Sequence, residues 1–240
     1  MPPIVEIENL TISYDPSIPA AVKSISFNVN AGEVLGVLGG NGAGKTSTLR
    51  SIAGIHPSSS GLISIDGIPL TSSKNFEQAR QLIGYCPDTS GLMRQATVRE
   101  HVGIVLGLHK QVENWPAALD LVELFGLSDV LDRETIGFSH GMSRRLSVLL
   151  ATLAAEKVLI LDEPFDGVDP LGVDATEKII SIAKEKGLAI IVSTHLLSLL
   201  TRVSDNIIVM AGGIIVDSAP SEEFLGEAGS DRYTRKLAGK

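Results

Sequence analysis

The chain has 240 residues, with 28 acidic against 20 basic side chains, and its formal net charge of −8 counts against broad nucleic-acid binding. Hydrophobic residues make up 44% of the sequence, enough to bury the core of one large α/β domain, and no apolar run approaches the roughly 20 residues of a membrane span. The lone cysteine, Cys86, excludes an internal disulfide and a cysteine-based zinc site, and we interpret it as a small core residue.

Alternating apolar residues predict two strands near the start of the chain, within 4–12 and 25–29, and we expect them to form an antiparallel edge. A further short strand is predicted over 61–67, and another at the end of 80–86. The first third of the chain therefore has mainly the pattern of strands.

A glycine-rich segment follows the apolar run 34–38 and reads Gly39-Gly40-Asn41-Gly42-Ala43-Gly44-Lys45-Thr46-Ser47. A strand that turns through glycines into a helix aims several backbone N–H groups at one point, where they can surround the phosphates of a nucleotide. We expect Lys45 to reach the β/γ oxygens and the Thr46 hydroxyl to ligate Mg²⁺. The alternative is a chance glycine-rich turn, but the preceding strand and the following helical pattern favour a phosphate loop.

The middle of the chain, from about 89 to 155, has the pattern of helices. The spacing of Thr97 and Glu100 is that of a capping box, and apolar residues before Gly126 predict a second helix that ends there. A third, amphipathic helix follows Phe138-Ser139-His140-Gly141-Met142, and its first N–H groups suit an anion, although in isolation this is an ordinary capped helix. We interpret two groups of basic residues as solvated surface: Arg144 with Arg145, and the C-terminal Arg232, Arg235, Lys236 and Lys240.

Near-continuous apolar runs return over 158–161, 189–192 and 207–210, separated by helical stretches. This pattern is typical of a parallel sheet covered on both faces, and Gly212-Gly213 predicts a hairpin after the last run. The predicted fold class is therefore α/β.

Two adjacent carboxylates, Asp162 and Glu163, close the first of these strands, at the edge where α/β sheets present residues to ligands. We expect Asp162 to meet Mg²⁺, directly or through water, and Glu163 to orient and deprotonate the attacking water. The alternative is a loop that faces solvent. His195 follows a strand at the same edge and is a candidate partner of the γ-phosphate, although a lone histidine is more often structural.

Taken in order, these motifs resemble those of the ATP-binding subunits of ABC transporters, and the resemblance covers essentially the whole chain. It implies a Walker A loop at 39–46, a glutamine-loop segment ending at Asp88, a signature motif at 138–142 and Walker B at 158–163. It implies further that Tyr14 stacks on adenine, that 167–169 is the D-loop and that His195 is the switch histidine. The implied catalytic residues are Glu163, His195 and Asp88, the magnesium ligands Thr46, Asp162 and Asp88, and the ATP-binding residues Tyr14, Gly39, Asn41, Gly42, Ala43, Gly44, Lys45, Thr46, Ser47, Ser139, Gly141 and Asp169.

The resemblance also implies an ABC ATPase fold, with a phosphate-loop core over 1–88 and 156–217 that includes the antiparallel strands. Residues 89–155 are expected to form a helical subdomain, and 218–240 a C-terminal tail. Two such subunits would close head to tail on ATP and Mg²⁺, each nucleotide lying between the phosphate loop of one and Ser139 with Gly141 of the other. They would drive a separate integral membrane permease from the cytoplasmic face of the membrane, with no nucleic acid involved.

Met142, the acidic Asp88 and the segment 97–100 resemble ATPases of exporter-type multidrug and antibiotic transporters. Asp88 stands where the family usually has glutamine, and His140 and Met142 replace a glycine and a glutamine of the signature. We interpret the site as competent. The alternatives are a degenerate site in a heterodimer, a nucleotide sensor with little turnover, and a soluble ABC protein acting on ribosomes or DNA. Leu92 and Met93 are either an apolar patch for the membrane partner or part of the core.

Overall fold

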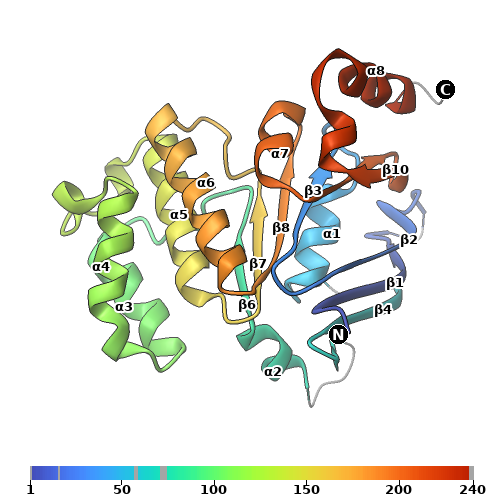
Figure 1. Ribbon diagram of the computed structural model, residues 1–240. Helices are drawn as coiled ribbons and strands as arrows, with labels where there is room; N and C mark the ends of the chain where they lie inside the picture. Colours follow the sequence, from blue (N-terminus) through green and yellow to red (C-terminus); the bar gives the residue numbers. More distant parts are fainter. Residues whose placement is uncertain (1, 16, 57–58, 71–74, 238–240) are drawn as a thin grey trace.

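A six-stranded sheet is the centre of the computed structural model, which describes residues 2–15, 17–56, 59–70 and 75–237 (Figure 1). Five of its strands are parallel, and β10 (Ile214–Pro220) runs antiparallel to β9 (Asn206–Ala211) after a turn at Gly212-Gly213. The prediction of a mostly parallel sheet with a final hairpin is therefore confirmed. The spatial order is β10 (Ile214–Pro220), β9 (Asn206–Ala211), β3 (Val34–Leu38), β8 (Ala189–Thr194), β7 (Val158–Asp162) and β6 (Ile83–Cys86).

Successive residues of each strand point to opposite faces of this sheet, so the near-continuous apolar runs serve two cores. Val34 and Leu38 belong to the core shared with the larger helices, whereas Leu35 and Val37 belong to the core shared with the antiparallel strands. The burial of both faces explains why these strands show no alternation of polar and apolar residues.

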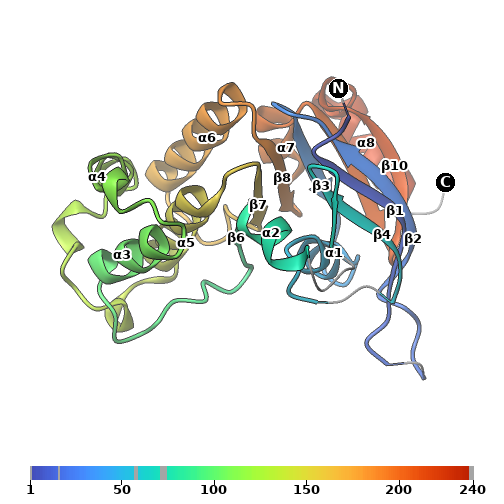
Figure 2. The same cartoon turned by 90° about the horizontal axis from the view of Figure 1, so that it is seen from below.

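A second sheet is antiparallel, and its first two strands pair as the sequence predicted. It lies at one end of the molecule, and helices α3 (Val98–Leu108) and α4 (Trp115–Leu124) lie at the other (Figures 1 and 2). Helix α1 (Lys45–Ile52) packs in the core between the two sheets, with Leu49 and Ile52 fully buried. The spatial order of the second sheet is β2 (Val22–Val29), β1 (Val5–Ile12), β4 (Ser60–Ile65) and β5 (Ile68–Pro69).

The helices of the middle region pack on the far side of the central sheet. Helix α3 starts at the predicted capping box, in which Thr97 Oγ1 accepts from Glu100 N and Glu100 Oε2 accepts from Thr97 N. Gly126 has φ +62° just after α4, as expected for a helix that ends in a left-handed residue. The remaining α-helices and the short 3₁₀ turns are α2 (Phe76–Gln81), α3 (Val98–Leu108), η1 (Val112–Asn114), α4 (Trp115–Leu124), η2 (Ser128–Val130), η3 (Thr135–Gly137), α5 (His140–Ala154), α6 (Pro170–Glu185), α7 (Leu197–Val203), η4 (Ser221–Phe224) and α8 (Gly226–Leu237).

The interpretation of Arg144 and Arg145 as solvated surface is wrong, because Arg144 is buried and Arg145 is only partly exposed, with its Nη1 donating to the carbonyl oxygen of Phe125. Helix α5 packs against β6, β7 and α3, and the residues that follow Arg144 at helical spacing, Ser147, Val148 and Ala151, are also buried. Arg144 is 1% exposed. Cys86 is buried as predicted.

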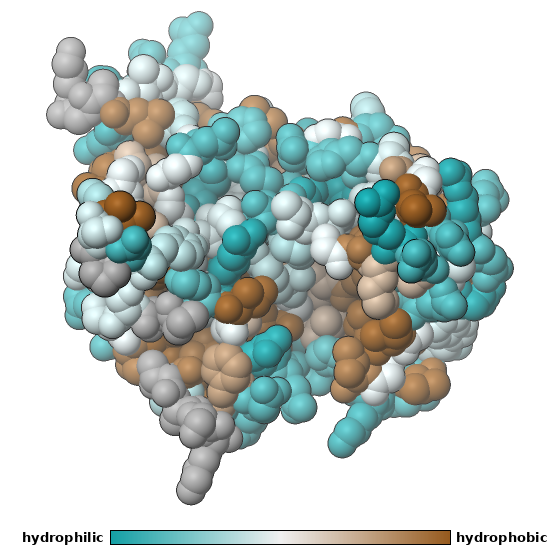
Figure 3. Space-filling view, turned by 180° about the vertical axis from the view of Figure 1, so that it is seen from behind, coloured by the Kyte–Doolittle hydropathy of each residue, from teal (hydrophilic) through white to brown (hydrophobic). Residues whose placement is uncertain are grey.

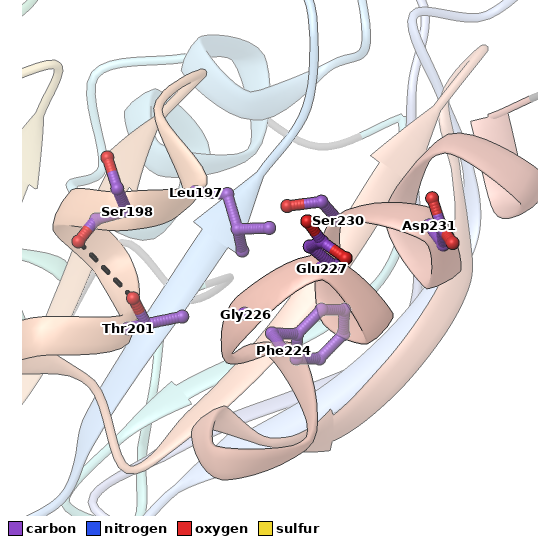
Figure 4. A pocket seen from close by; sticks show the side chains of 8 residues that line it. All are labelled: Leu197, Ser198, Thr201, Phe224, Gly226, Glu227, Ser230 and Asp231. Atoms are coloured by element: carbon purple, nitrogen blue, oxygen red, sulfur yellow. Dashed lines mark hydrogen bonds between the residues drawn. The ribbon is translucent and has the colours of Figure 1, made fainter.

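The C-terminal helix α8 leaves a cavity of about 680 Å³ between itself and α7, with Ser198 and Thr201 on one wall and Glu227 and Asp231 on the other (Figure 4). None of the predicted site residues lines it. Arg235 and Lys236 are exposed, as expected for solvated basic residues, whereas Arg232 is paired with Asp217 and Glu223; Lys240 lies outside the described residues. No helix in the described part of the chain is both long and apolar enough to cross a membrane.

Candidate active site

A pocket of about 280 Å³ lies over the glycine-rich segment, where β3 turns into α1. The turn requires glycine at two positions at least. Gly44 has φ +103°, and a Cβ there would lie 2.8 Å from the carbonyl oxygen of Ala21. A Cβ on Gly39 would lie 2.5 Å from the carbonyl oxygen of Met210. The pocket is lined by Ala21, Gly40, Asn41, Gly42, Ala43, Gly44, Lys45, Thr46, Ser47, Asp88 and Glu163.

Lys45 is the first residue of α1, and its ammonium group is almost completely buried. Its Nζ donates to the carbonyl oxygen of Gly39 at 2.8 Å and lies 3.1 Å from Oε1 of Glu163. The lysine is therefore held at the floor of the pocket by a backbone carbonyl and a carboxylate.

Glu163 follows β7 with φ +49°, a left-handed conformation that is uncommon outside glycine. Its backbone N–H donates to both the carbonyl and the hydroxyl oxygen of Ser193 on β8, at 3.1 Å each. Its second carboxylate oxygen, Oε2, lies 3.2 Å from Nδ1 of His195. The structure thus brings together Lys45, Glu163 and His195, three residues that are distant in the sequence.

Asp162 is the last residue of β7 and is fully buried. The Ser193 hydroxyl donates to its Oδ1 at 2.5 Å, while Oδ2 has no hydrogen-bond partner. Burial raises the pKa of the Asp162 carboxyl, because the hydroxyls of Ser193 and Thr46 replace only part of the hydration that the charged form loses.

Asp88 lies at the pocket wall, and its Oδ1 accepts from Nη2 of Arg50 at 2.9 Å. Arg50 belongs to α1, so the helix that begins at the phosphate loop also holds the Asp88 carboxylate. The two side chains are each more than a third exposed, and such a partly exposed pair stabilises the fold only slightly.

Tyr14 lies beside the pocket, next to Ser47, which lines it, and the Tyr14 side chain is 54% exposed. Its hydroxyl donates to Oγ of Ser47 at 3.0 Å, and its ring stacks on His56 with the centroids 4.4 Å apart. The Ser47 contact places this ring beside the start of α1.

Seven predicted residues do not line the pocket: Tyr14, Gly39, Ser139, Gly141, Asp162, Asp169 and His195. Tyr14, Gly39 and His195 contact residues that line it, and Asp162 precedes Glu163 in the chain, whereas Ser139, Gly141 and Asp169 lie at the starts of other helices. Ser139 caps α5 by accepting from Met142 N at 3.2 Å, and Asp169 caps α6 by accepting from Gly172 N at 3.0 Å. His140 lies next to Gly167, with its Nε2 3.4 Å from Oδ2 of Asp166. These residues therefore form a second cluster, at the starts of two helices.

Comparison with known proteins identifies the family. The sequence model of the family described as "ABC transporter" matches residues 22–166, more than half of the chain. The chain belongs to the ABC transporter family.

Two curated relatives and one solved structure show how far the likeness of this ABC ATPase extends. It is 32% identical over 227 residues to the lipopolysaccharide export system ATP-binding protein LptB of Haemophilus influenzae, covering 93% of each chain. It is 33% identical to the bacitracin transport ATP-binding protein BcrA of Bacillus licheniformis, over 93% of this chain and 72% of the relative. A structure described as the ATP-binding subunit of an ABC transporter superposes with a TM-score of 0.89 and 28% identity, over 98% of this chain and 99% of the other. The protein is an ATP-binding subunit whose ATP hydrolysis is coupled to transport, and the predicted ABC ATPase fold is confirmed.

The residues of this ABC ATPase fit a magnesium ion held jointly with a nucleotide. The unpartnered Oδ2 of Asp162 is a buried acceptor that a cation would satisfy. No group of three or more His, Cys, Asp or Glu side chains arranged to hold a metal occurs in the residues that the structure describes. A site of one or two carboxylates completed by a hydroxyl and phosphate oxygens is the kind that Mg²⁺ prefers.

Four residues near the site were missed by reasoning from the sequence: Arg50, Ser193, His56 and Arg144. Ser193 and Arg50 hold Asp162 and Asp88, and His56 covers one face of Tyr14. Only Arg144 had a local signal, because it shares a helical face with residues that are buried. The other three contact partners across the sheet or across a turn, which spacing along the chain does not reveal.

Proposed function

We propose that this ABC ATPase powers an exporter-type transporter through ATP-driven closure of a dimer coupled to a separate membrane subunit. The export role draws on the names of its relatives, which act in lipopolysaccharide export and bacitracin transport. Only the first of these names states a direction, and the 32% identity to that lipopolysaccharide export protein over 93% of this chain is the support for proposing export.

The observation that carries the catalytic part is the convergence of Lys45, Glu163 and His195. Lys45 and the N–H groups of 40–46 bind the triphosphate, while Glu163 accepts a proton from the attacking water. His195 holds the Glu163 carboxylate and donates toward the γ-phosphate. When bound, Mg²⁺ neutralises charge on the phosphate oxygens, and Thr46, Asp162 and Asp88 would hold it. Tyr14 provides the ring on which adenine stacks.

The second cluster supports the dimer. Ser139, Gly141 and Asp169 lie outside the pocket of their own chain, at the starts of α5 and α6, and the first N–H groups of α5 suit an anion. We propose that they complete the pocket of a second subunit, either a copy of this chain or a related one. A single subunit, which holds only half of each site, would then not hydrolyse ATP.

A groove on the surface of the helical region is the proposed contact for the membrane subunit. Met93 and Ile104 line this groove, and each is about half exposed. On the face that Figure 3 shows, apolar patches interrupt the otherwise hydrophilic surface. Leu92, in contrast, packs against the core. Of the two roles considered for Leu92 and Met93, we therefore assign core packing to Leu92 and partner contact to Met93.

Binding and turnover measurements test this proposal. Lys45→Ala should abolish ATP binding in calorimetry with Mg²⁺ present. The control is Lys178→Ala, which changes an exposed lysine of α6 and should leave ATP binding normal. Normal ATP binding by Lys45→Ala would remove the lysine from its role. The membrane part predicts co-purification with a polytopic membrane protein that moves its substrate outward. Inward movement of the substrate would contradict the exporter assignment. Co-sedimentation with ribosomes, without any membrane protein that co-purifies, would favour a soluble ABC protein.

A further inference from the structure

Arg144 occupies an unusual position for a charged side chain. It lies in the second turn of α5 and is 1% exposed, the largest side chain in the fully buried set. Within the described residues, no carboxylate lies at ion-pair distance from its guanidinium. An arginine stays protonated inside a protein, so a full charge is buried here without a counter-ion.

Backbone carbonyl groups take the place of the counter-ion. Nη1 donates to the carbonyl oxygen of Pro87, with a longer contact of 3.4 Å to the carbonyl of Asp162, and Nη2 donates to the carbonyl oxygen of Asp88. Nη1 also lies 3.9 Å from Sγ of Cys86. These acceptors come from the ends of β6 and β7, which are neighbours in the sheet.

One side chain therefore joins three parts of the proposed site. It comes from the helix that Ser139 caps, it binds the chain at Asp88, and it contacts the backbone of Asp162. The Asp88 carboxylate is held separately, by Arg50 of α1. Asp88 is thus held at its carbonyl group from α5 and at its side chain from α1.

A buried unpaired cation costs stability, and an apolar residue of similar size would fill the same space. A buried charge without a counter-ion departs from the usual packing of a protein core, and such a departure beside an active site points to a functional role. The planar fork of arginine, with donors at fixed angles, can bind two successive carbonyl groups at once and so fix the course of the backbone there.

We propose that Arg144 is a positioning residue, which fixes the segment Pro87-Asp88 relative to helix α5 so that the Asp88 side chain reaches the magnesium and water positions. This inference rests on the role proposed above for Asp88. Arg144 is not proposed to touch nucleotide or metal, and its effect on turnover passes through Asp88.

A double-mutant cycle tests it in the full chain with its membrane partner. Arg144→Met should lower kcat about tenfold or more while ATP affinity stays within about threefold. Asp88→Asn should also lower kcat, and adding Arg144→Met to it should lower kcat no further, because both changes remove the same positioned carboxylate. The matched control is Arg145→Met. Arg145 follows on the same helix, but it donates to the carbonyl oxygen of Phe125 and not to the segment at Asp88, so kcat should change by less than about twofold.

Cys86 supplies a readout that does not depend on activity. As the single cysteine it reports on the segment that Arg144 holds, and its thiol should react with a maleimide faster in Arg144→Met than in Arg145→Met. If Arg144→Met fails to fold, Arg144→Lys is the substitute, because lysine keeps the positive charge and a single ammonium donor group but not the planar fork. This variant should also lose kcat with little change in ATP affinity, and its loss of kcat should be smaller.

The possible outcomes distinguish a failure of the role proposed for Arg144 from a failure of the proposed function. A multiplicative loss in the double variant, or a loss of ATP affinity as large as the loss of kcat, overturns the role of Arg144 and leaves the proposed function intact. Full activity of Asp88→Asn would remove Asp88 from the proposed function, and this inference with it.

Discussion

Lys45 and Glu163 form a mostly buried ion pair, with Nζ 3.1 Å from Oε1. The lysine that is proposed to bind the phosphates is thus engaged by the carboxylate that is proposed to activate water. In the proposed mechanism, phosphate oxygens take the place of Glu163 at Lys45, and this exchange leaves the Glu163 carboxylate free to accept a proton from water.

Glu163→Gln separates these two roles. The neutral amide cannot pair with Lys45 as strongly, so ATP should bind about three- to tenfold more tightly, and turnover should fall by about 10² or more because the general base is lost. Calorimetry and phosphate release measure the two effects. Unchanged turnover would show that another group deprotonates the water.

Asp162→Asn should stabilise the nucleotide-free protein while it abolishes magnesium-dependent turnover. Burial raises the pKa of this carboxyl above its ordinary 3.8, so its contribution to folding is largest at low pH and is lost as the pH rises through the folded-state pKa. At neutral pH the asparagine variant should gain about 1 kcal/mol, which for this chain length is roughly 2–4 °C in Tm.

The sign of that effect can be checked by acidification. The gain in Tm should shrink as the pH falls, because the wild-type carboxyl then becomes neutral as well. Asp174→Asn, which changes an exposed carboxylate of α6, is the control and should leave Tm almost unchanged. A lower Tm for Asp162→Asn at pH 7 would mean that the charged carboxylate stabilises the empty site.

Tyr14→Ala should weaken ATP binding by about tenfold with little change in kcat, since a stacked base contributes about 1–3 kcal/mol. Tyr14→Phe keeps the ring and loses only the hydrogen bond to Ser47, so it should bind ATP within about twofold of the wild type. Steady-state kinetics at saturating Mg²⁺ measure both. Equal losses in the two variants would place the contribution in the hydroxyl instead of the ring.

Asp88→Gln tests the alternative of a nucleotide sensor. The longer neutral side chain gives up the pairing with Arg50 and extends further into the pocket. We expect measurable turnover in the wild type and a lower but measurable rate in this variant, because its amide keeps an oxygen that can face Mg²⁺ but loses the charge of the carboxylate. Negligible rates in both proteins, despite tight ATP binding and a demonstrated dimer, would favour a sensor.

Much of this protein follows from local pattern. The glycine spacing before Lys45 requires a tight turn, the buried runs over 158–161 and 189–192 require a sheet covered on both faces, and the spacing of Thr97 and Glu100 defines a helix start. Each of these depends on residues that are close in the sequence, so the chemistry of the segment determines its shape.

Tertiary structure alone decided which distant side chains meet. The parallel order β8-β7 places Ser193 beside Asp162, and it places His195 beside Glu163. The inward face of α5 turns Arg144 from an apparent surface residue into a buried one that binds the backbone at Asp88. Contacts of this kind depend on how strands are ordered and which face of a helix is covered, and burial of apolar surface over the whole chain sets both.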